Sequence, residues 1–385
     1  MAVLPFYISN KKNLKIIIVG GGYAGIAALT TITRYQPNAE ITLIDPKINH
    51  VKITHLHETF RYPLTDFLIP FADIEQKFGC RHLSLELPFN ESTLLQWARE
   101  KSISIHNESL PFDYLLIASG ALDNNSNQDI NDVMGLSPFM KLSGSEILGQ
   151  FLAKPGTDAP ISVVGGGATG IQFLFEIEHF LRNHKYKNKL RLIDSGNQVL
   201  KQFPDRFADY VQTLMTNLNI EYYSTTYFRG QHHGQIRLEN KKTNSQFELP
   251  SSLTFLFSGK SQGSLLKANA FGQLIIDHQV LQHIFVAGDC SYYQSIGSNT
   301  LTAQSAVRKG KLAACNLLRH SGLLKILEPY LHRDIGYVVS LGPSDAVGWL
   351  ALENNMVTGL AAHTIKEIVE AQYDLLLVGI DTYLL

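Results

Sequence analysis

Cysteine is scarce in this sequence: only three of its 385 residues are cysteines, namely Cys80, Cys290 and Cys315. They lie far apart in the chain, and no two of them form the Cys-x-x-Cys spacing of redox-active dithiols. The same wide spacing argues against a zinc motif and against a disulfide framework. We therefore expect the protein to work in a reducing compartment, without a thiol relay of its own.

Long apolar runs are also lacking. No segment approaches the roughly 18 uncharged apolar residues that a membrane-spanning helix requires. The longest late run, residues 375–380, is closed by Asp374 and Asp381. The N-terminal segment has no extended apolar stretch typical of a signal peptide, so we interpret it as the approach to a first strand.

The charge shows no excess of either sign. The chain has 33 basic and 34 acidic residues, a net charge of -1 and an isoelectric point of about 6.9. Nucleic-acid binding depends on clustered positive charge, whereas Lys and Arg are scattered here among acids. We therefore expect no nucleic-acid partner. With 45% hydrophobic residues, the chain has enough apolar side chains for two or three domains.

Two glycine-rich loops are the strongest positive signal. The first follows residues 14–19, an apolar run typical of a strand buried on both faces of a parallel sheet. Gly20, Gly22 and Gly25 then form a G-x-G-x-x-G pattern at the start of a helical stretch. In such a loop the first glycine makes the tight turn, the second admits a pyrophosphate, and the third lets the helix pack on the strand. The next strand ends on Asp45, where a carboxylate can accept hydrogen bonds from a ribose.

The same unit recurs in the middle of the chain. Gly165, Gly167 and Gly170 follow the apolar run 161–164, and the strand after the helix ends on Asp194. A decayed copy that packs without binding is the alternative interpretation. Because strand, loop, helix, strand and terminal acid are all present, we predict two dinucleotide sites.

The acid of the second unit also bears on which nicotinamide nucleotide binds. Asp194 lies where the 2′-phosphate of NADPH would be placed, so its carboxylate repels NADPH and favours NADH. Arg191 and Lys189 are close in sequence and leave NADPH open.

Two further motifs complete a familiar arrangement. FDYLLIASG ends on Ser119 and Gly120, and IFVAGDC contains Asp289. With the two glycine loops in this order, the chain resembles the flavoprotein reductases that bind two dinucleotides. The resemblance implies FAD in the first unit, with Asp289 on the ribitol chain of the flavin, and a nicotinamide nucleotide in the second. It also implies that Gly259 closes the nucleotide domain with a tight turn.

The resemblance predicts an α/β fold with two Rossmann-like dinucleotide-binding domains, arranged as in glutathione reductase, and a C-terminal cap. The FAD-binding domain should be discontinuous, because its second motif follows the NAD unit. The expected parts are residues 1–122 and 265–325 for the FAD-binding domain, 123–264 for the NAD(H)-binding domain and 326–385 for the cap.

Within that group the chain is most similar to the type II NADH dehydrogenases, single-subunit flavoproteins that oxidise NADH and reduce a quinone at a membrane surface. The missing Cys-x-x-Cys excludes the disulfide reductases, and sulfide oxidation is not expected because only Cys290 lies near the predicted flavin in sequence. The resemblance implies hydride transfer from NADH to FAD and electron transfer to a quinone-type acceptor. The matching segments are LIDPKINH, LIDSGNQVLKQFPD, LTAQSAVRKGKLAACNL, SLGPSDAVG and TGLAAHTIKEIVEAQY.

Departures from the family pattern concern the residues expected to be catalytic. A glutamate normally follows Thr-Gly-Ile near the nicotinamide and flavin, and this chain has Gln172, which cannot carry a proton. The Ala-Gln-x-Ala-x-Gln pattern of the quinone pocket keeps Gln304 but has Arg308 as its last residue. Both changes fall on the acceptor side, so NADH oxidation is better supported than quinone reduction. The helix that begins near Thr302 and Ala303 should direct its N–H groups at the flavin.

Two other functions stay open on the sequence. The first is a soluble NADH reductase that passes electrons to a small quinone, a dye-like oxidant, or an iron-sulfur or haem protein. The second is a flavin-binding regulatory protein in which Gln172 and Arg308 mark lost turnover.

The remaining predictions concern metals and the C-terminal region. His50, His55 and His57 follow the second strand without a carboxylate or cysteine cluster, so we predict no metal site. In the resembled family the C-terminal region contacts the bilayer, which implies a cytoplasmic protein peripheral on the inner face of the membrane through residues 364–385. Four acids against one lysine oppose an anionic lipid surface, so packing on the protein's own domains or in a homodimer is equally open. The apolar face expected for this helix comprises Ile365, Val369, Tyr373, Leu376, Ile380 and Leu384.

Overall fold

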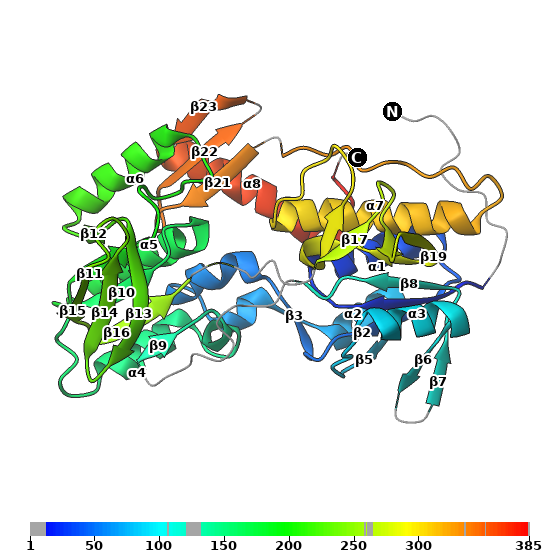
Figure 1. Ribbon diagram of the computed structural model, residues 1–385, viewed down its shortest axis with the longest axis horizontal. Helices are drawn as coiled ribbons and strands as arrows, with labels where there is room; N and C mark the ends of the chain where they lie inside the picture. The colour runs from blue at the N-terminus through cyan, green and yellow to red at the C-terminus, as the bar shows by residue number, and fades with distance from the viewer. Residues whose placement is uncertain are drawn as a thin grey trace.

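The chain forms two lobes joined by a C-terminal unit (Figure 1). We call residues 13–120 together with 265–334 the first lobe, 132–257 the second lobe, and 336–383 the C-terminal unit. The domain ends expected at residues 122 and 264 lie outside the described residues. The computed structural model describes residues 13–105, 108–120, 132–257, 259, 265–334, 336–350 and 352–383, without the side chains of 352–354.

The first lobe is built on an eight-stranded sheet in the order β20-β17-β18-β19-β8-β1-β2-β5. β1 pairs in parallel with β2 and β8, and β8 pairs in parallel with β19, so the chain returns to this sheet after the second lobe. The first lobe is therefore formed by two separate parts of the chain. The strands are β1 (Lys15–Val19), β2 (Glu40–Ile44), β5 (Arg81–Leu83), β8 (Tyr114–Ile117), β17 (Leu266–Ala268), β18 (Gln273–Ile276), β19 (Gln279–Val286) and β20 (Ser291–Tyr293).

Both faces of this sheet are covered, as the unbroken apolar run of β1 requires. Ile16 and Ile18 point to α1 (Tyr23–Tyr35), α2 (Phe71–Phe78) and α7 (Ala303–Ser321), whereas Ile17 points to the face covered by α3 (Glu91–Glu100). α1 and α7 pack so closely that a Cβ on Gly310 would lie 2.2 Å from the carbonyl oxygen of Ala24. A small hairpin, β6 (Ser102–Ile105) and β7 (Glu108–Pro111), extends from the lobe.

The second lobe repeats the plan with a five-stranded parallel sheet in the order β12-β11-β10-β16-β9. An antiparallel sheet of β13, β14 and β15 packs through Ile236 and Leu238 against the residues Val164 and Ile193 of the parallel sheet. The predicted α/β fold with two Rossmann-like units is therefore confirmed. The elements are β9 (Val133–Met134), β10 (Ile161–Val164), β11 (Leu190–Ile193), β12 (Glu221–Tyr223), β13 (Thr226–His232), β14 (Gln235–Asn240), β15 (Gln246–Pro250), β16 (Leu253–Leu256), α4 (Gly144–Leu152), α5 (Ala168–Asn183), α6 (Asp205–Asn217) and the 3₁₀ helix η3 (Ser137–Met140).

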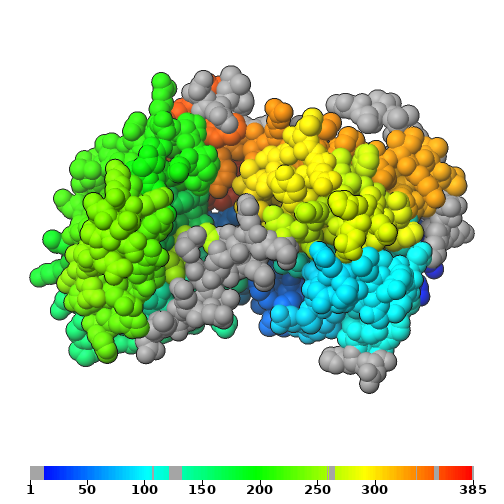
Figure 2. All heavy atoms as spheres, in the orientation of Figure 1, coloured from blue at the N-terminus to red at the C-terminus, as the bar shows by residue number. Residues whose placement is uncertain are grey.

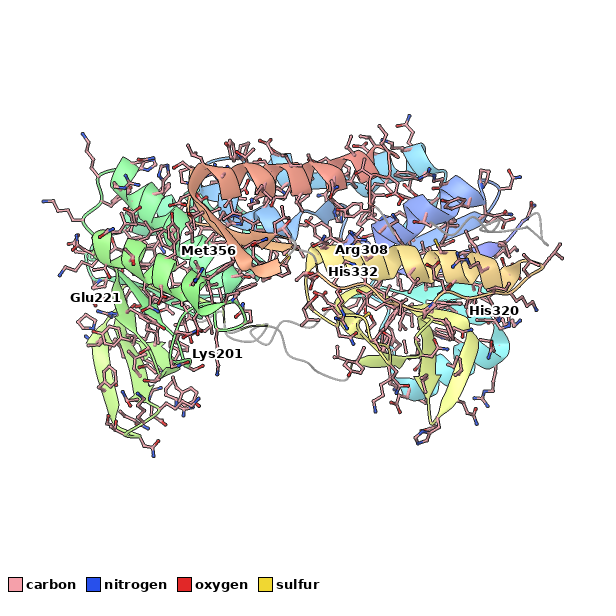
Figure 3. The ribbon with its side chains drawn as sticks, turned by 90° about the horizontal axis from the view of Figure 1, so that it is seen from above. Lys201, Glu221, Arg308, His320, His332 and Met356 are labelled. Carbon is pink, nitrogen blue, oxygen red and sulfur yellow. The ribbon has the colours of Figure 1, made fainter. Side chains whose placement is uncertain are left out.

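The C-terminal unit ties the two lobes together. Its strands β21 (Gly336–Ser340), β22 (Ala346–Leu350) and β23 (Leu352–Thr358) are antiparallel and lie beside α5 and α6, and α8 (Gly359–Leu377) runs from the second lobe to the first (Figure 3). Tyr210 of α6 donates a hydrogen bond to Asp345 over 3.0 Å. Tyr373 of α8 bonds His50 of the first lobe over 2.9 Å.

The observed helix α8 differs from the expected C-terminal helix in two respects. The helix ends at Leu377, so Ile380 lies beyond it, and Leu384 lies outside the described residues. Its buried side is partly polar, because Lys366 is buried there while Val369 is exposed. Charged side chains supplied by the first lobe cause this difference, as described below.

A segment of the first lobe inserts into the core of the second. It comprises β3 (Asn49–Val51), the 3₁₀ helices η1 (Ile53–Phe60) and η2 (Leu64–Phe67), and β4 (Leu68–Pro70). Leu56 and Phe60 share one apolar cluster with Phe139, Phe173 and residues of the C-terminal unit. The histidines expected on a loop therefore lie at the junction of both lobes.

Among the residues that the structure describes, no helix is long and apolar enough to cross a bilayer.

Candidate functional site

The first glycine loop has the shape that close packing of its strand and helix demands. Gly20 has φ +104°, and a Cβ there would lie 2.2 Å from the carbonyl oxygen of Ala118. A Cβ on Gly25 would lie 1.9 Å from the carbonyl oxygen of Gly20. Gly22 has no atom within 4 Å of its virtual Cβ. The first and third glycines thus compact the loop, and the second faces open space where a pyrophosphate can approach the backbone.

The second loop keeps the complete geometry of the first. Gly165 has φ +112°, and its Cβ would lie 2.2 Å from the carbonyl oxygen of Phe257. A Cβ on Gly170 would lie 1.9 Å from the carbonyl oxygen of Gly165, while that of Gly167 has only Gln202 Nε2, at 3.9 Å, nearby. This correspondence favours a second dinucleotide-binding loop over a decayed copy of the first loop.

Both loops end in a helix N-terminus that lacks side-chain capping. Gly22 and Gly167 are the N-caps of α1 and α5, and no side-chain oxygen accepts a bond from either first turn. The first N–H groups of a helix need acceptors, and together they form a site for anions. A pyrophosphate fits both positions.

A carboxylate closes each loop at the end of the next strand. Asp45 follows β2 and accepts hydrogen bonds from Gly21 N at 2.7 Å and Lys47 N at 2.9 Å. Asp194 follows β11 and accepts from Gly166 N and Gly196 N. A carboxylate offers about four acceptor positions, so each acid can also accept from ribose hydroxyls.

Arg191 and Lys189, the basic residues that could favour NADPH binding, do not lie beside Asp194. Arg191 is buried on the opposite face of β11, where its Nε lies 3.0 Å from Glu221 Oε2 and its Nη1 donates to the carbonyl oxygen of Pro250. Lys189 precedes the strand and so lies at its other end. Within this geometry neither side chain is placed to neutralise a 2′-phosphate near Asp194.

The second flavin motif converges on the first loop. Asp289 lies in the 3₁₀ helix η4 (Gly288–Cys290) directly after β19, and Ser119 and Gly120 directly follow β8. β19, β8, β1 and β2 are consecutive parallel strands, so these residues share one edge of the sheet with Asp45. Ligands of open α/β sheets bind outside such carboxyl ends. In the second lobe Gly259, with φ +88°, similarly follows β16.

α7 begins where the sequence predicts. Thr302 is its N-cap and accepts a bond from Ser305 N at 3.0 Å, and Ala303 is its first residue. In Figure 3 the end of α7 near Arg308 lies toward the middle of the molecule, whereas His320 marks the outer end. The positive end of the helix dipole is therefore directed toward the space between the lobes.

Of the two α7 residues predicted to lie on the acceptor side, Arg308 lies beside the last part of the described chain. Gln304 is in the first turn and partly buried. Arg308 is one turn further, with its guanidinium 6.0 Å from the ring centre of Tyr383, and burial lowers the pKa of Arg308. Lys311 holds this segment in place, since its Nζ lies 2.9 Å from Asp381 Oδ1 and 3.0 Å from Tyr383 O.

Gln172 lies on the other lobe, in the second turn of α5. Its Nε2 donates to Ser340 Oγ of β21 at 3.1 Å, and Ser340 Oγ lies 2.8 Å from Nε2 of His57 in η1. The three predicted catalytic residues thus divide between two helices of different lobes: Gln172 on α5, and Gln304 with Arg308 on α7.

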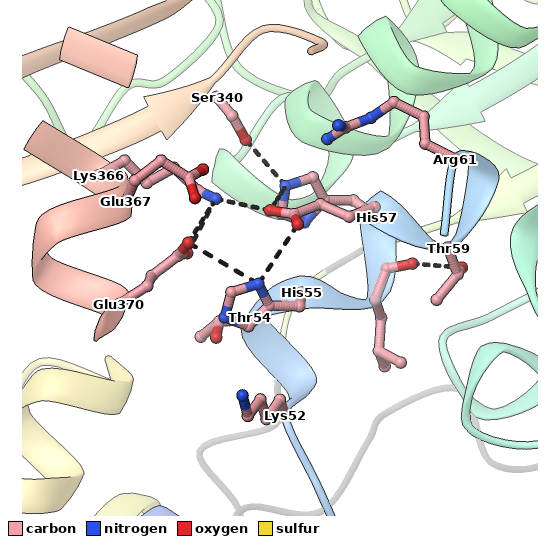
Figure 4. Close-up of polar contacts among 12 residues, drawn as sticks. Lys52, Thr54, His55, His57, Thr59, Arg61, Ser340, Lys366, Glu367 and Glu370 are labelled. Carbon is pink, nitrogen blue, oxygen red and sulfur yellow. Dashed lines mark hydrogen bonds and ion pairs between the residues drawn. The ribbon is translucent and has the colours of Figure 1, made fainter. Parts of the chain in front are cut away.

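A charged cluster at this junction was not predicted (Figure 4). Lys366 Nζ lies 2.7 Å from Glu58 Oε1 and 2.9 Å from Glu370 Oε1. His55 Nδ1 is 3.4 Å from Glu58 Oε2 and 3.7 Å from Glu370 Oε2, and His57 Nε2 is 3.5 Å from Glu58 Oε1. The cluster joins two distant parts of the chain, because Lys366 of α8 lies 308 residues from Glu58 of η1.

Part of this cluster has the composition of a cation site. Single ligand atoms of His55, Glu58 and Glu370 lie within 4.8 Å of one another. The Lys366 ammonium, however, is already bonded to both carboxylates and supplies the positive charge. The arrangement therefore favours an internal salt bridge over a metal site.

Comparison with known proteins agrees with the site geometry. The family model "Pyridine nucleotide-disulphide oxidoreductase" matches residues 14–310. A type II NADH:quinone oxidoreductase of Staphylococcus epidermidis is 25% identical over 398 aligned residues, covering 93% of this chain and 94% of the relative. A Staphylococcus aureus protein of the same name is 23% identical over 391 residues, with 93% and 94% coverage. These relatives confirm the resemblance inferred from the motifs.

Solved structures agree on the fold. NDH2 from Plasmodium falciparum in complex with NADH superposes with a TM-score of 0.75 at 18% identity, covering 93% of this chain and 94% of that one. The sulfide:quinone oxidoreductase of Aquifex aeolicus gives 0.74 at 14% identity, covering 96% and 92%. With two glycine cradles, two loop-closing acids and a family match over most of its length, the chain belongs to the pyridine nucleotide-disulphide oxidoreductase family.

Proposed function

We propose that this protein is an FAD-dependent oxidoreductase that oxidises NADH and passes the electrons to a quinone-type acceptor. The observation that carries the proposal is the pair of loops with matching glycine geometry, one in each lobe. A single dinucleotide site would serve a binding protein or a dehydrogenase with a diffusing cofactor. Two sites in separate lobes let one dinucleotide stay bound while the other exchanges.

FAD would be held by the first lobe. The open face of Gly22 and the N-terminus of α1 fit its pyrophosphate, Asp45 fits its ribose, and Asp289 lies at the same sheet edge for the ribitol chain. FAD supplies the hydride-accepting chemistry when bound, whereas the protein orients the reactants and sets the electrostatics. The N-terminus of α7 would stabilise negative charge at the flavin end of the site.

NADH would be held by the second lobe. Gly167 and the N-terminus of α5 fit its pyrophosphate, and Asp194 fits its adenosine ribose. Because Arg191 is bonded to Glu221 on the opposite face of β11, we expect Asp194 to disfavour NADPH.

The quinone-type acceptor follows the relatives, whose names specify a quinone. The replacements at Gln172 and Arg308 favour a second candidate, a reductase of another small or protein acceptor, because the family resemblance assigns both positions to the acceptor side. A flavin-binding regulatory protein with little turnover is the third outcome of the same test.

Anaerobic rapid mixing tests the proposal. The purified yellow protein should lose its flavin absorbance quickly with NADH and more slowly with NADPH, then regain it on addition of a soluble quinone. Loss without recovery would favour the other acceptor class. If NADH causes no loss of flavin absorbance, the proposed enzymatic function is refuted and the regulatory protein is favoured.

We also propose that the protein lies peripherally on the inner face of the cytoplasmic membrane and contacts it through α8. One side of this helix is buried, and the opposite side carries an exposed apolar stripe. The acids that oppose lipid binding in the sequence are largely neutralised: Glu370 pairs with Lys366, Asp374 with Lys52, and Asp381 with Lys311. A homodimer covering the same stripe is the competing arrangement. The stripe comprises Leu360, Ile368 and Leu375 of α8, and the exposed Val378 directly follows the helix.

A further inference from the structure

A continuous line of polar side chains leads from Gln172 to a partly exposed histidine across the junction of the lobes, and Figure 4 shows its part from Ser340 to His55. Gln172 Nε2 donates to Ser340 Oγ over 3.1 Å, and Ser340 Oγ lies 2.8 Å from His57 Nε2. The same nitrogen is 3.5 Å from Glu58 Oε1. The other oxygen of Glu58 is 3.4 Å from Nδ1 of His55, whose side chain keeps 15% of its surface accessible.

Most of this line is buried in three packed elements. Ser340 and His57 are each 2% exposed and Glu58 is 8% exposed. A buried ion pair such as Glu58 with Lys366 adds little stability over apolar residues of the same volume, because both charges lose hydration. Stability alone is therefore a weak reason for two histidines, two carboxylates and a lysine to occupy this junction, and perturbed ionisable groups cluster at functional sites.

The proposed reaction supplies a use for such a line. NADH and a quinone become NAD⁺ and a quinol with the uptake of one proton, because NADH delivers two electrons with only one proton. That proton comes from solvent. Gln172, next to the end of the line, cannot carry it, since an amide does not ionise.

We propose that Glu58 carries this proton inward: the proton enters at His55, passes through the Glu58 carboxylate to His57 Nε2, and reaches the hydroxyl of Ser340 on the acceptor side. Each transfer breaks one N–H or O–H bond and forms the next. At Ser340 the arriving proton bonds to Oγ while the hydroxyl's own proton leaves for the acceptor. Lys366 and Gln172 are positioning residues. Lys366 fixes Glu58, and the amide of Gln172 donates to Ser340 Oγ, so that the hydroxyl proton points away from Gln172 and can pass to the acceptor. This inference rests on the proposed quinone reduction.

The groups around Glu58 keep its carboxylate ionised at rest, which leaves it free to accept a proton. It is faced by His55 and His57 from η1, by Arg61 directly after η1, by Lys366 and Glu370 from α8, and by Glu176 from α5. Burial raises the pKa of Glu58, but the imidazole of His55 beside its carboxylate and the charge of Lys366 outweigh burial, so the pKa is lowered. Burial lowers the pKa of His57 to about 3. Glu58 thus rests ionised beside a neutral His57.

The substitution Glu58→Gln tests the proposal. Glutamine keeps the size of the side chain and can still accept the bond from Lys366, but it cannot relay a proton. We expect flavin bleaching by NADH at the wild-type rate and recovery with a soluble quinone slowed about a hundredfold, the loss typical of a missing acid-base group. Recovery in the variant should slow further with rising pH. A pH-indicator dye in weak buffer should show proton uptake delayed in parallel.

Two further variants separate relay from structure. Glu176→Gln is the matched control, because Glu176 forms a buried pair with Arg61 at the same junction (2.9 Å) but outside the line. It should lower stability and keep the wild-type recovery rate. Glu58→Asp keeps a carboxylate and should restore part of the recovery, even if Glu58→Gln folds poorly.

The outcomes are distinct. Recovery of Glu58→Gln at the wild-type rate and pH profile would overturn the relay. Equal slowing of bleaching and recovery would also overturn it, because Glu58 would then be structural only. If the wild-type protein is bleached by NADH but not reoxidised by quinone, the proposed acceptor fails first, and the relay is lost with it.

Discussion

The six loop glycines are of two kinds, defined by what a side chain would meet. At Gly25 and Gly170 a Cβ would lie 1.9 Å from a carbonyl oxygen of the same loop, and at Gly20 and Gly165 it would lie 2.2 Å from a carbonyl oxygen that follows the neighbouring strand. At Gly22 and Gly167 it would enter open space. The first kind is needed for the protein to fold, and the second kind is needed for the ligand to bind. Alanine at the first kind should therefore affect stability, and alanine at the second kind should affect binding.

Alanine substitutions in the second loop test this distinction. Gly170→Ala should lower the free energy of unfolding by about 1–3 kcal/mol, as overpacking does, and should also weaken NADH binding. Gly167→Ala should keep the wild-type stability and weaken NADH binding alone. Thermal unfolding and NADH titration of the FAD-loaded protein measure both effects. Equal stability loss in the two variants would contradict the assigned geometry.

Asp194 should decide between NADH and NADPH. Asp194→Ser removes the negative charge, so the ratio of kcat/KM for NADH over NADPH should fall about tenfold, equivalent to about 1.4 kcal/mol. Arg191→Met is the control, because Arg191 faces away from Asp194 and pairs with Glu221. That variant should be less stable and keep the wild-type ratio. An unchanged ratio in Asp194→Ser would show that specificity lies elsewhere.

At the scale of elements, α8 is fixed to the first glycine loop through a buried histidine. His50 Nδ1 lies 2.8 Å from the carbonyl oxygen of Gly21, which can only accept, so Nδ1 carries the hydrogen. Nε2 then accepts from the hydroxyl of Tyr373 at 2.9 Å. Burial lowers the pKa of His50 to about 4. The contact between helix and loop therefore depends on a neutral imidazole.

This contact predicts loss of stability in mild acid. The unfolded chain binds a proton at His50 below about pH 6.5, whereas the folded chain does so only near pH 4. Stability is thus complete above pH 6.5 and is lost as the pH falls toward 4, by on the order of 3 kcal/mol for this group. His50→Asn should be less stable at neutral pH and show a shallower slope in denaturant titrations. The exposed His233→Asn should keep the wild-type slope, and an equally steep His50→Asn would contradict the assignment.

At the scale of the whole molecule, the two lobes stand apart with a hollow between them (Figure 2). α8 bridges them with one side and leaves its apolar stripe exposed on the other. We expect the protein to bind anionic vesicles through this stripe.

Ile368 tests the membrane contact. Ile368→Glu should weaken binding to phosphatidylglycerol vesicles about tenfold, the effect of losing one buried aliphatic side chain. Ile48→Glu changes an equally exposed isoleucine that is not on α8 and should bind as the wild type does. Flotation with vesicles measures the binding. If Ile368→Glu instead converts a dimer to a monomer without changing flotation, a second copy covers the stripe.

The sequence predicts what is local in the chain. Gly20, Gly25 and Asp45 act within one strand-loop-helix-strand unit, so their spacing determines their geometry. The cluster of Glu58 with Lys366 joins residues 308 positions apart, and no short motif reports such a contact. The apolar periodicity of α8 predicted the wrong buried side for the same reason. Lys366 is buried because it pairs with Glu58, which is distant in the chain.

The most direct test of the two-cradle architecture is the binding stoichiometry of the purified protein, measured by flavin release and by calorimetric titration with NAD⁺. We predict one FAD and one NAD⁺ per chain, with Gly167→Ala weakening only NAD⁺ and Gly22→Ala weakening only FAD. A single site for which FAD and NAD⁺ compete would contradict it.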